Sequence, residues 1–186
     1  GARVDPHRGT WSALLPPMPG GPHEYTPTVT HRTTSASLQH VVFGDVWMCA
    51  GQSNAALSLG HTMSRNATVD AIRRGRYANV RLARPLVDET LYKSNETHLL
   101  RPWLTAQAAV ADGSAAAPTY SLFDFCASCW YFAQALTDEF AAARRPPPTL
   151  GLVCAAASGS QIEKWAPADA LAAECSHTLA PNGGSA

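Results

Sequence analysis

The stretch of sequence that decides the fold is Gly44–Asn54, which reads GDVWMCAGQSN. Its first part, Asp45–Ala50, is short and nearly all apolar, and a glycine follows it. Such a run is typical of a buried strand of a parallel sheet that leads into a tight turn. Ligands of open parallel sheets bind at the carboxyl ends of the strands, so we expect Ser53 to stand at such a crevice.

Ser53 is therefore the first candidate for chemistry. A serine hydroxyl beside backbone N–H groups supplies a nucleophile and part of an oxyanion hole. The same Gly-x-Ser turn also occurs without any catalytic role, so a plain turn is the alternative. The nucleophile elbow of the α/β-hydrolases, G-x-S-x-G, does not match, because Ala55 takes the place of the final glycine.

Downstream of this stretch, apolar runs and helical patterns alternate. The sequence predicts a helix over Ala67–Arg76, a strand over Asn79–Ala83, a helix over Ser121–Arg144, a strand over Thr149–Ala155 and a helix over Pro167–Cys175. Apolar residues of the longest helix recur at helical spacing and predict one core-facing stripe: Phe125, Cys129, Phe132, Leu136 and Phe140. Residues 86–119 are loop-rich and predict no element. The alternation predicts an α/β fold with a parallel sheet and covering helices.

The segment upstream has a different texture. Pro16–Pro22 reads PPMPGGP, which excludes a helix and a central strand there. Tyr25–Thr34 is β-branched and alternating, which suits edge strands of a small β element. We therefore expect two parts: residues 1–38, the trailing part of an N-terminal β element, and residues 39–186, the N-terminal part of the main domain.

Composition narrows the function classes. The chain has 186 residues, of which 46% are hydrophobic and 15% are charged, and its 14 basic residues balance its 14 acidic residues. This balance argues against a nucleic-acid partner and against wholesale disorder. No apolar run approaches the roughly 18 residues of a membrane span. The chain begins without Met or a signal peptide and ends in a breaker-rich tail, so we expect a piece of a longer precursor.

Cysteines and glycosylation motifs point to a compartment. The sequence contains five cysteines, and Cys126 and Cys129 form a C-x-x-C within the expected helix, where they share a face. Buried thiols, or a disulfide between two of the five with its pairing left open, are favoured over a zinc or redox site. Asn66 and Asn95 begin N-x-[ST] motifs and are N-glycosylation candidates. We expect a secreted protein or one of the lysosomal or secretory-pathway lumen.

The residues that suggest a strand and a turn also carry a family resemblance. Gly44–Asn54 resembles G-D-V-W-x-C-x-G-Q-S-N-M, a block of the sialate O-acetylesterases of the SGNH hydrolase superfamily. Three more segments resemble blocks of the same family and follow in the family's order. Pro17–Pro22 resembles P-x-x-P-G-G-P, and Phe125–Leu136 resembles S-A-V-C-x-x-F-G-R. Leu150–Trp165 resembles P-I-G-L-I … W-G-G-T-P-I-E-A-W. The resemblance implies a flavodoxin-like three-layer fold, with a parallel sheet and helices on both faces. It would be incomplete at the C-terminus and preceded by the end of a small β module.

The resemblance also implies a site. Ser53 falls on the family's nucleophile, and its backbone N–H would be one oxyanion donor. Gly159 falls on the second glycine of W-G-G-T, whose N–H would be the second donor. Four further residues are supporting candidates: Gly51, Gln52, Asn54 and Glu163. Ala55 and Ala157-Ser158 depart from the family pattern and put the fit of the substrate in doubt.

Other parts of the family's machinery have no counterpart in this sequence. The third oxyanion donor, an Asn, lies in a later W-Y-Q-G-E-S-N block, and the His base lies in a D-x-x-H block. Neither block occurs here, and the nearest approach is Glu174–His177. We therefore expect the chain alone to have little or no activity, and we consider a C-terminal remainder of the same precursor as its partner.

The implied reaction is acyl transfer from an acetylated sugar, most readily an O-acetylated sialic acid, with no metal and no cofactor. Two alternatives stay open. One is a carbohydrate-binding module that has lost the catalytic chemistry. The other is an acetylesterase that acts on other acetylated polysaccharides.

Overall fold

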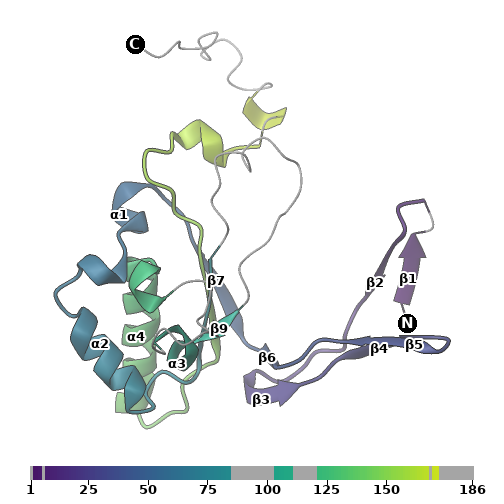
Figure 1. Cartoon of the computed structure of the whole chain (residues 1–186), viewed down its shortest axis with the longest axis horizontal. Coiled ribbons are helices and arrows are strands. Elements are labelled where there is room, and N and C mark those ends of the chain that lie inside the picture. The colour runs from purple at the N-terminus through teal and green to yellow at the C-terminus, as the bar shows by residue number, and fades with distance from the viewer. Residues whose placement is uncertain (1, 6, 85–102, 111–120, 168, 172–186) are drawn as a thin grey trace.

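The computed structural model describes residues 2–5, 7–84, 103–110, 121–167 and 169–171. They form an α/β body, from which an arm of antiparallel hairpins extends toward the N-terminus (Figure 1). None of the helices in these ranges is long and apolar enough to cross a membrane.

The body is built on one mixed sheet with the order β7-β10-β8-β9. Its strands are β7 (Asp45–Cys49), β10 (Leu150–Cys154), β8 (Val80–Ala83) and β9 (Leu104–Thr105). The central strand β10 runs parallel to both β7 and β8, whereas β9 is antiparallel to β8. The predicted α/β class with parallel strands is therefore confirmed.

The helices agree with the expected ones in place but differ in their ends. The structure contains α1 (Ser53–Ala56), α2 (Arg65–Arg73), α3 (Ala106–Ala109) and α4 (Ala127–Ala142), with 3-10 turns η1 (Leu59–His61), η3 (Leu122–Asp124) and η4 (Ile162–Trp165). The longest helix begins later than predicted because Ser121 and Asp124 form a capping box that closes η3 first. Strand β9 and helix α3 lie in the segment for which the sequence predicted no element. Most of the expected helix over 167–175 lies outside the described residues.

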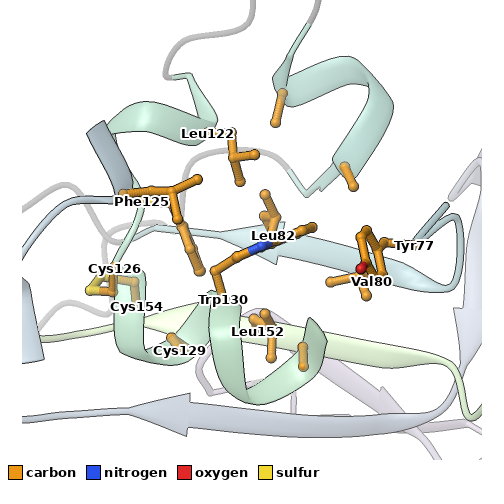
Figure 2. Packing of buried hydrophobic residues seen from close by; sticks show 14 of the residues in the cluster. Tyr77, Val80, Leu82, Leu122, Phe125, Cys126, Cys129, Trp130, Leu152 and Cys154 are labelled. Carbon is orange, nitrogen blue, oxygen red and sulfur yellow. A yellow bond between two sulfur atoms is a disulfide. The ribbon is translucent and has the colours of Figure 1, made fainter. Parts of the chain in front are cut away.

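The apolar core lies between the sheet and the helices (Figure 2). Leu82 and Leu152 project from neighbouring strands into one cluster with Trp130, and all three are 0% exposed. Residues of α2, α3 and α4 belong to this same cluster, so these three helices cover one face of the sheet. Helices on the other face, which the three-layer expectation requires, are not among the described residues.

The predicted stripe is confirmed in part: Phe125 and Cys129 are 0% and 1% exposed, and Leu136 packs against the core. The buried residues of the helix are Ala127, Cys129, Trp130, Ala133 and Thr137. Phe132, which the apolar stripe placed in the core, is 39% exposed, and its ring lies 5.0 Å from that of Trp47 at the edge of the sheet. The indole of Trp130 removes more apolar area from water than the stripe's smaller side chains, and small residues at 133 and 137 let the helix approach the sheet.

Strand β7 is parallel, as predicted, but it is not buried. In the described part of the chain β10 pairs with one side of β7, and no strand pairs with the other side. Val46 is 66% exposed and Met48 is 70% exposed. Both project away from the helices, on the face where the Trp103 ring lies over Gly151. The expectation of burial was wrong because an apolar run cannot report whether its second neighbour is present.

The N-terminal segment forms three antiparallel pairs, whereas the alternating pattern predicted strands only over Tyr25–Thr34, where β4 lies and β5 begins. The pairs are β1 (Ala2–Asp5) with β2 (Thr10–Ala13), β3 (Gly21–Tyr25) with β6 (Val41–Phe43), and β4 (Thr28–His31) with β5 (Thr34–Ser37). Glu24 accepts hydrogen bonds from Arg81 of β8 at 2.8 Å and from His40 at 2.7 Å. Its carboxylate therefore links the arm to the body, and the contacts with His40 and Arg81 lower the pKa of Glu24.

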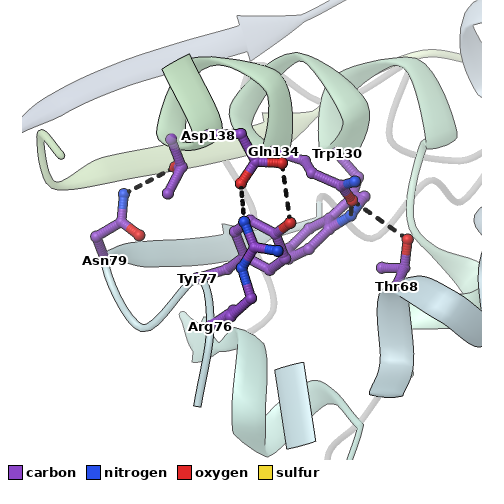
Figure 3. A network of polar contacts seen from close by, with 8 residues as sticks. Thr68, Arg76, Tyr77, Asn79, Trp130, Gln134 and Asp138 are labelled. Atoms are coloured by element: carbon purple, nitrogen blue, oxygen red, sulfur yellow. Dashed lines mark hydrogen bonds and ion pairs between the residues drawn. The ribbon is translucent and has the colours of Figure 1, made fainter. Parts of the chain in front are cut away.

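A polar network fastens α4 to the segments around α2 and β8 (Figure 3). Asp138 accepts from Arg76 at 2.5 Å and from the Tyr77 hydroxyl at 3.1 Å. Gln134 accepts from the Trp130 indole at 2.9 Å and from Thr68 at 3.2 Å. The buried polar groups of this interface are thus satisfied, as stability requires.

Tyr77 makes the stability of this interface sensitive to alkaline pH. Burial, and then the neighbouring Asp138 charge, raise the pKa of Tyr77 above its ordinary value of 10.0. Because this pKa is higher in the folded state, Tyr77 contributes its full share of stability below its unfolded-state pKa. That contribution is lost as pH rises through its folded-state pKa. We expect the free energy of unfolding, measured with urea, to fall above about pH 10. The fall should be shallower in Tyr77→Phe; an identical slope in both proteins would contradict this assignment.

Candidate functional site

The turns that follow β7 and β10 run side by side beyond the ends of the strands. The N–H of Ala155 donates to the carbonyl of Cys49 at 2.9 Å, and the N–H of Ala157 donates to the carbonyl of Gly51 at 2.9 Å. Ser53 and Gly159 each follow this paired stretch by two residues. Ser53 and Gly159, the two residues singled out in the sequence, therefore lie just beyond the ends of two neighbouring strands.

Ser53 is the first residue of α1, and its hydroxyl is at the surface. Gln52 is the N-cap of this helix, and its side-chain oxygen accepts from the Ser53 backbone N–H at 3.0 Å and from Ser53 Oγ at 2.8 Å. One oxygen atom thus takes both donors of Ser53. An acyl oxygen in an esterase would use that backbone N–H, so Gln52 has to turn away when such a ligand binds.

The backbone at Gly51 brings Ser53 into this position. Gly51 has a φ of +141°, a conformation that side chains with a Cβ rarely adopt, and a Cβ built on it would lie 2.8 Å from the Cβ of Ala55. Ala55, the position where the family block carries Met, therefore packs directly against the turn. A glycine at position 51 is a requirement of the turn itself.

We expect Gly51→Val to lower the free energy of unfolding by about 2–4 kcal/mol, from backbone strain together with the clash at Ala55. Urea unfolding followed by circular dichroism measures the loss. Gly159→Ala is the matched control: Gly159 has a φ of +71° but no atom within 4 Å of a built Cβ, so only the backbone cost of about 1–2 kcal/mol applies. Equal losses in both variants would show that the clash contributes nothing.

Hydrogen bonds of Ser160 and Trp165 stabilise the turn that carries Gly159. Ser160 is 7% exposed, and its hydroxyl donates to the carbonyl of Ala157 at 2.7 Å. The indole of Trp165, on η4, donates to the same hydroxyl at 3.0 Å. Gly159 itself is exposed. Its N–H thus belongs to an ordered turn although the preceding residues, Ala157 and Ser158, depart from the family's W-G.

The remaining site candidates lie farther from this pair of turns or make no contact that assigns a role. Asn54 is exposed on α1, and Glu163 is exposed on η4, where it forms no ion pair within the described part of the chain. Asn66 is exposed on α2, so it can carry a glycan. Asn95 and the Glu174–His177 segment lie outside the described residues. Among the residues that the structure describes, Ser53 hydrogen-bonds to Gln52 and to no histidine.

Two disulfides lie directly beneath these turns. Cys49 is bonded to Cys129 and Cys126 to Cys154, with Cα atoms 5.8 Å apart in each pair. The sequence predicted a disulfide between two of the cysteines and left its pairing open. The structure does not favour the zinc or redox alternative for the C-x-x-C, because Cys126 and Cys129 each form a disulfide with a cysteine at the end of a strand. One feature of the sequence could have indicated this pairing: two cysteines lie at the ends of strands, and the other two lie close together at the start of a helix. Cys175 lies outside the described residues.

The chain is similar to known proteins over most of its length. No family model matches the sequence. The chain is 31% identical to a rat (Rattus norvegicus) sialate O-acetylesterase over 173 residues, which is 88% of this chain and 28% of that protein. It is 29% identical to the human (Homo sapiens) sialate O-acetylesterase over 179 residues, which is 91% of this chain and 31% of that protein. The chain therefore spans under a third of the length of these relatives.

A solved structure extends the comparison to the fold. The crystal structure of a carbohydrate acetylesterase from Xanthomonas citri matches with a TM-score of 0.62 and 22% sequence identity. The match covers 90% of this chain and 34% of that one. At this identity the likeness concerns the fold alone.

Proposed function

From the similarity of this chain to sialate O-acetylesterases, we propose that it belongs to that family and forms the nucleophile-bearing part of a carbohydrate O-acetylesterase whose substrates are O-acetylated sialic acids. The observation that carries the proposal is the exposed Ser53 at the start of α1, beside the turn that bears Gly159. A serine hydroxyl with backbone N–H groups nearby is what acyl transfer requires.

The proposed reaction uses these groups in order. Ser53 Oγ attacks the carbonyl carbon of the acetyl ester, and its proton passes to a general base. The N–H groups of Ser53 and Gly159 hold the oxygen that becomes negative. The sugar oxygen then leaves with the proton from the base, and water releases acetate from the acyl-serine in the reverse sequence. A histidine base has to come from outside the described residues, so we expect the isolated chain to turn over little or no ester.

The open side of β7 supports an incomplete domain. A parallel sheet is normally covered on both faces, yet Val46 and Met48 are largely exposed at the unpaired edge. We propose that 39–186 is the first portion of an SGNH domain with three layers, that 1–38 closes a small β module, and that a C-terminal remainder supplies the cover together with the base and its partner.

The cysteines support a proposal for the compartment in which the protein folds. Disulfides persist in oxidising compartments and are rare in the cytosol. Two of them in the described part of the chain, together with the exposed Asn66, favour a secreted protein or a lysosomal or secretory-pathway protein. Mass spectrometry of the secreted protein before and after glycosidase treatment tests the use of both Asn66 and Asn95.

The deciding experiment measures acetate release from 9-O-acetylated sialic acid and from p-nitrophenyl acetate. It compares the 186-residue chain with the protein expressed from its complete reading frame. We expect turnover from the latter only. Absence of release from both proteins, together with retained sialic acid binding in Ser53→Ala, would replace the esterase by the carbohydrate-binding alternative. Faster release from acetylated plant or microbial polysaccharide than from sialic acid would keep the reaction and change the substrate.

A further inference from the structure

The two disulfides join both strands of the site to a single helical turn. Cys49 and Cys154 are the last residues of β7 and β10, and they lie opposite each other in the parallel register. Their partners are Cys129, in the first turn of α4, and Cys126, the N-cap of that helix. All four cysteines therefore lie around the N-terminus of α4; Figure 2 labels Cys126, Cys129 and Cys154.

The same turn of α4 also holds the chain beyond α1. The N–H of Ala127 donates to the carbonyl of Leu57 at 2.8 Å, and Ser58 forms a β-bridge with Cys126. Residues 50–56, which include Ser53, thus span from one attachment to the other. The Gly159 turn is attached in turn through Cys154, five residues before it.

Within the described residues, the end of β7 has few noncovalent attachments to the helices. β7 is an edge strand paired with β10 alone, and its residues 45–48 are exposed, as are Gln52, Ser53 and Asn54. The Trp47 ring packs against Phe132 of α4, and Ala55 and Ala56 pack against the core. The hydrogen bonds from Ala155 and Ala157 join the two turns to each other but not to a helix. The covalent links to α4 add to this packing in setting the position of the paired turns on the body.

We propose that the two disulfides are positioning elements of the proposed oxyanion site: Cys49–Cys129 holds the backbone N–H of Ser53, and Cys126–Cys154 holds that of Gly159. This inference rests on the proposed function for the role of these N–H groups. Its structural content is separate, because it states that each disulfide orders one particular turn. If the disulfides only stabilised the fold, removing either one would lower stability and would affect the Ser53 and Gly159 turns alike.

The test uses the order parameters of backbone amides in ¹⁵N relaxation of the oxidised chain and of two double variants, Cys49→Ala/Cys129→Ala and Cys126→Ala/Cys154→Ala. In the oxidised chain we expect values near 0.85 for Ser53 and Gly159, as in rigid backbone. The first variant should bring Ser53 below about 0.6, and the second should do the same for Gly159, while Leu152 in the sheet stays rigid in both. If an alanine pair fails to fold, Val at position 49 or 154 with Ala at its partner fills the space with apolar atoms.

Ile72→Ala is the control for lost stability, because Ile72 is 0% exposed in α2, a helix that carries no cysteine. It should lower the melting temperature without changing the order parameters of either turn. The proposal is overturned if both turns loosen equally in every variant, or if neither loosens.

An acetate titration on the same samples tests the proposed function separately. Acetate is the product of the proposed reaction, and its carboxylate can accept from both N–H groups. Saturable shifts of the Ser53 and Gly159 amides in the oxidised chain, reduced in the matching variant, are expected. If acetate shifts neither amide while the order parameters change as described, the proposed function fails and the positioning role of the disulfides stands.

Discussion

In the protein expressed from its complete reading frame, Ser53→Ala is expected to lower kcat for acetyl ester hydrolysis by about 10⁴-fold or more. Without the hydroxyl no acyl-serine can form, and only the N–H groups and substrate binding remain to assist water. KM should change little, because Ser53 Oγ contacts a neighbouring side chain, Gln52, and gives the substrate no large binding surface. Initial rates with p-nitrophenyl acetate and with O-acetylated sialic acid measure both constants.

Ser35→Ala is the matched control, since it makes the same chemical change at an exposed position on β5 of the N-terminal arm. It should leave kcat and KM unaltered. An active Ser53→Ala protein, within tenfold of the parent, would remove Ser53 from the reaction and would leave the turn after β7 as a plain structural turn.

Trp130→Ala is expected to lower the free energy of unfolding by about 3–5 kcal/mol. Trp130 is 0% exposed, its ring lies 5.7 Å from that of Tyr77, and its indole donates to Gln134. The substitution leaves a cavity between α4 and the sheet and removes one donor from the polar network. Urea unfolding followed by near-UV and far-UV circular dichroism measures the loss and tests whether the transition stays cooperative.

Phe132→Ala provides the comparison, because Phe132 lies on the same helix but is 39% exposed. Its loss should cost about 1–2 kcal/mol, in keeping with partial burial. The order of the two effects separates the observed core face of α4 from the stripe that the sequence predicted. A larger loss at Phe132 than at Trp130 would contradict the packing described here.

The candidate site was predictable to the extent that it depends on local sequence. An apolar run followed by Gly51-Gln52-Ser53 predicted a strand, a tight turn and an exposed serine. The structure adds the positive φ of Gly51 and the short helix that begins at Ser53, which the sequence did not predict. Gly159 was found through the resemblance to the esterase segment, and its positive φ explains why a glycine stands there. Gln52 was named only as a supporting residue, and no local pattern indicated that its amide oxygen would take both donors of Ser53.

The face of α4 shows why periodicity has a limit. Apolar residues lie on more than one side of this helix, so the pattern alone could be drawn through Phe132 or through Trp130. Cys129 belongs to the predicted stripe and is buried, so the difference lies on the neighbouring side, where Trp130 and the small residues at 133 and 137 face the core. These depend on the partner surface, which a single helix does not encode.

By itself the sequence determined the alternation of strands and helices, the turn that presents Ser53 and the resemblance to the sialate O-acetylesterases, because these depend on residues close together along the chain. Only the tertiary structure decided the pairing of the cysteines, the edge position of β7 and the meeting of the Ser53 and Gly159 turns. Each of these depends on which distant segments pack together, and the free energy that selects those contacts is shared among the whole core rather than carried by any one stretch of sequence.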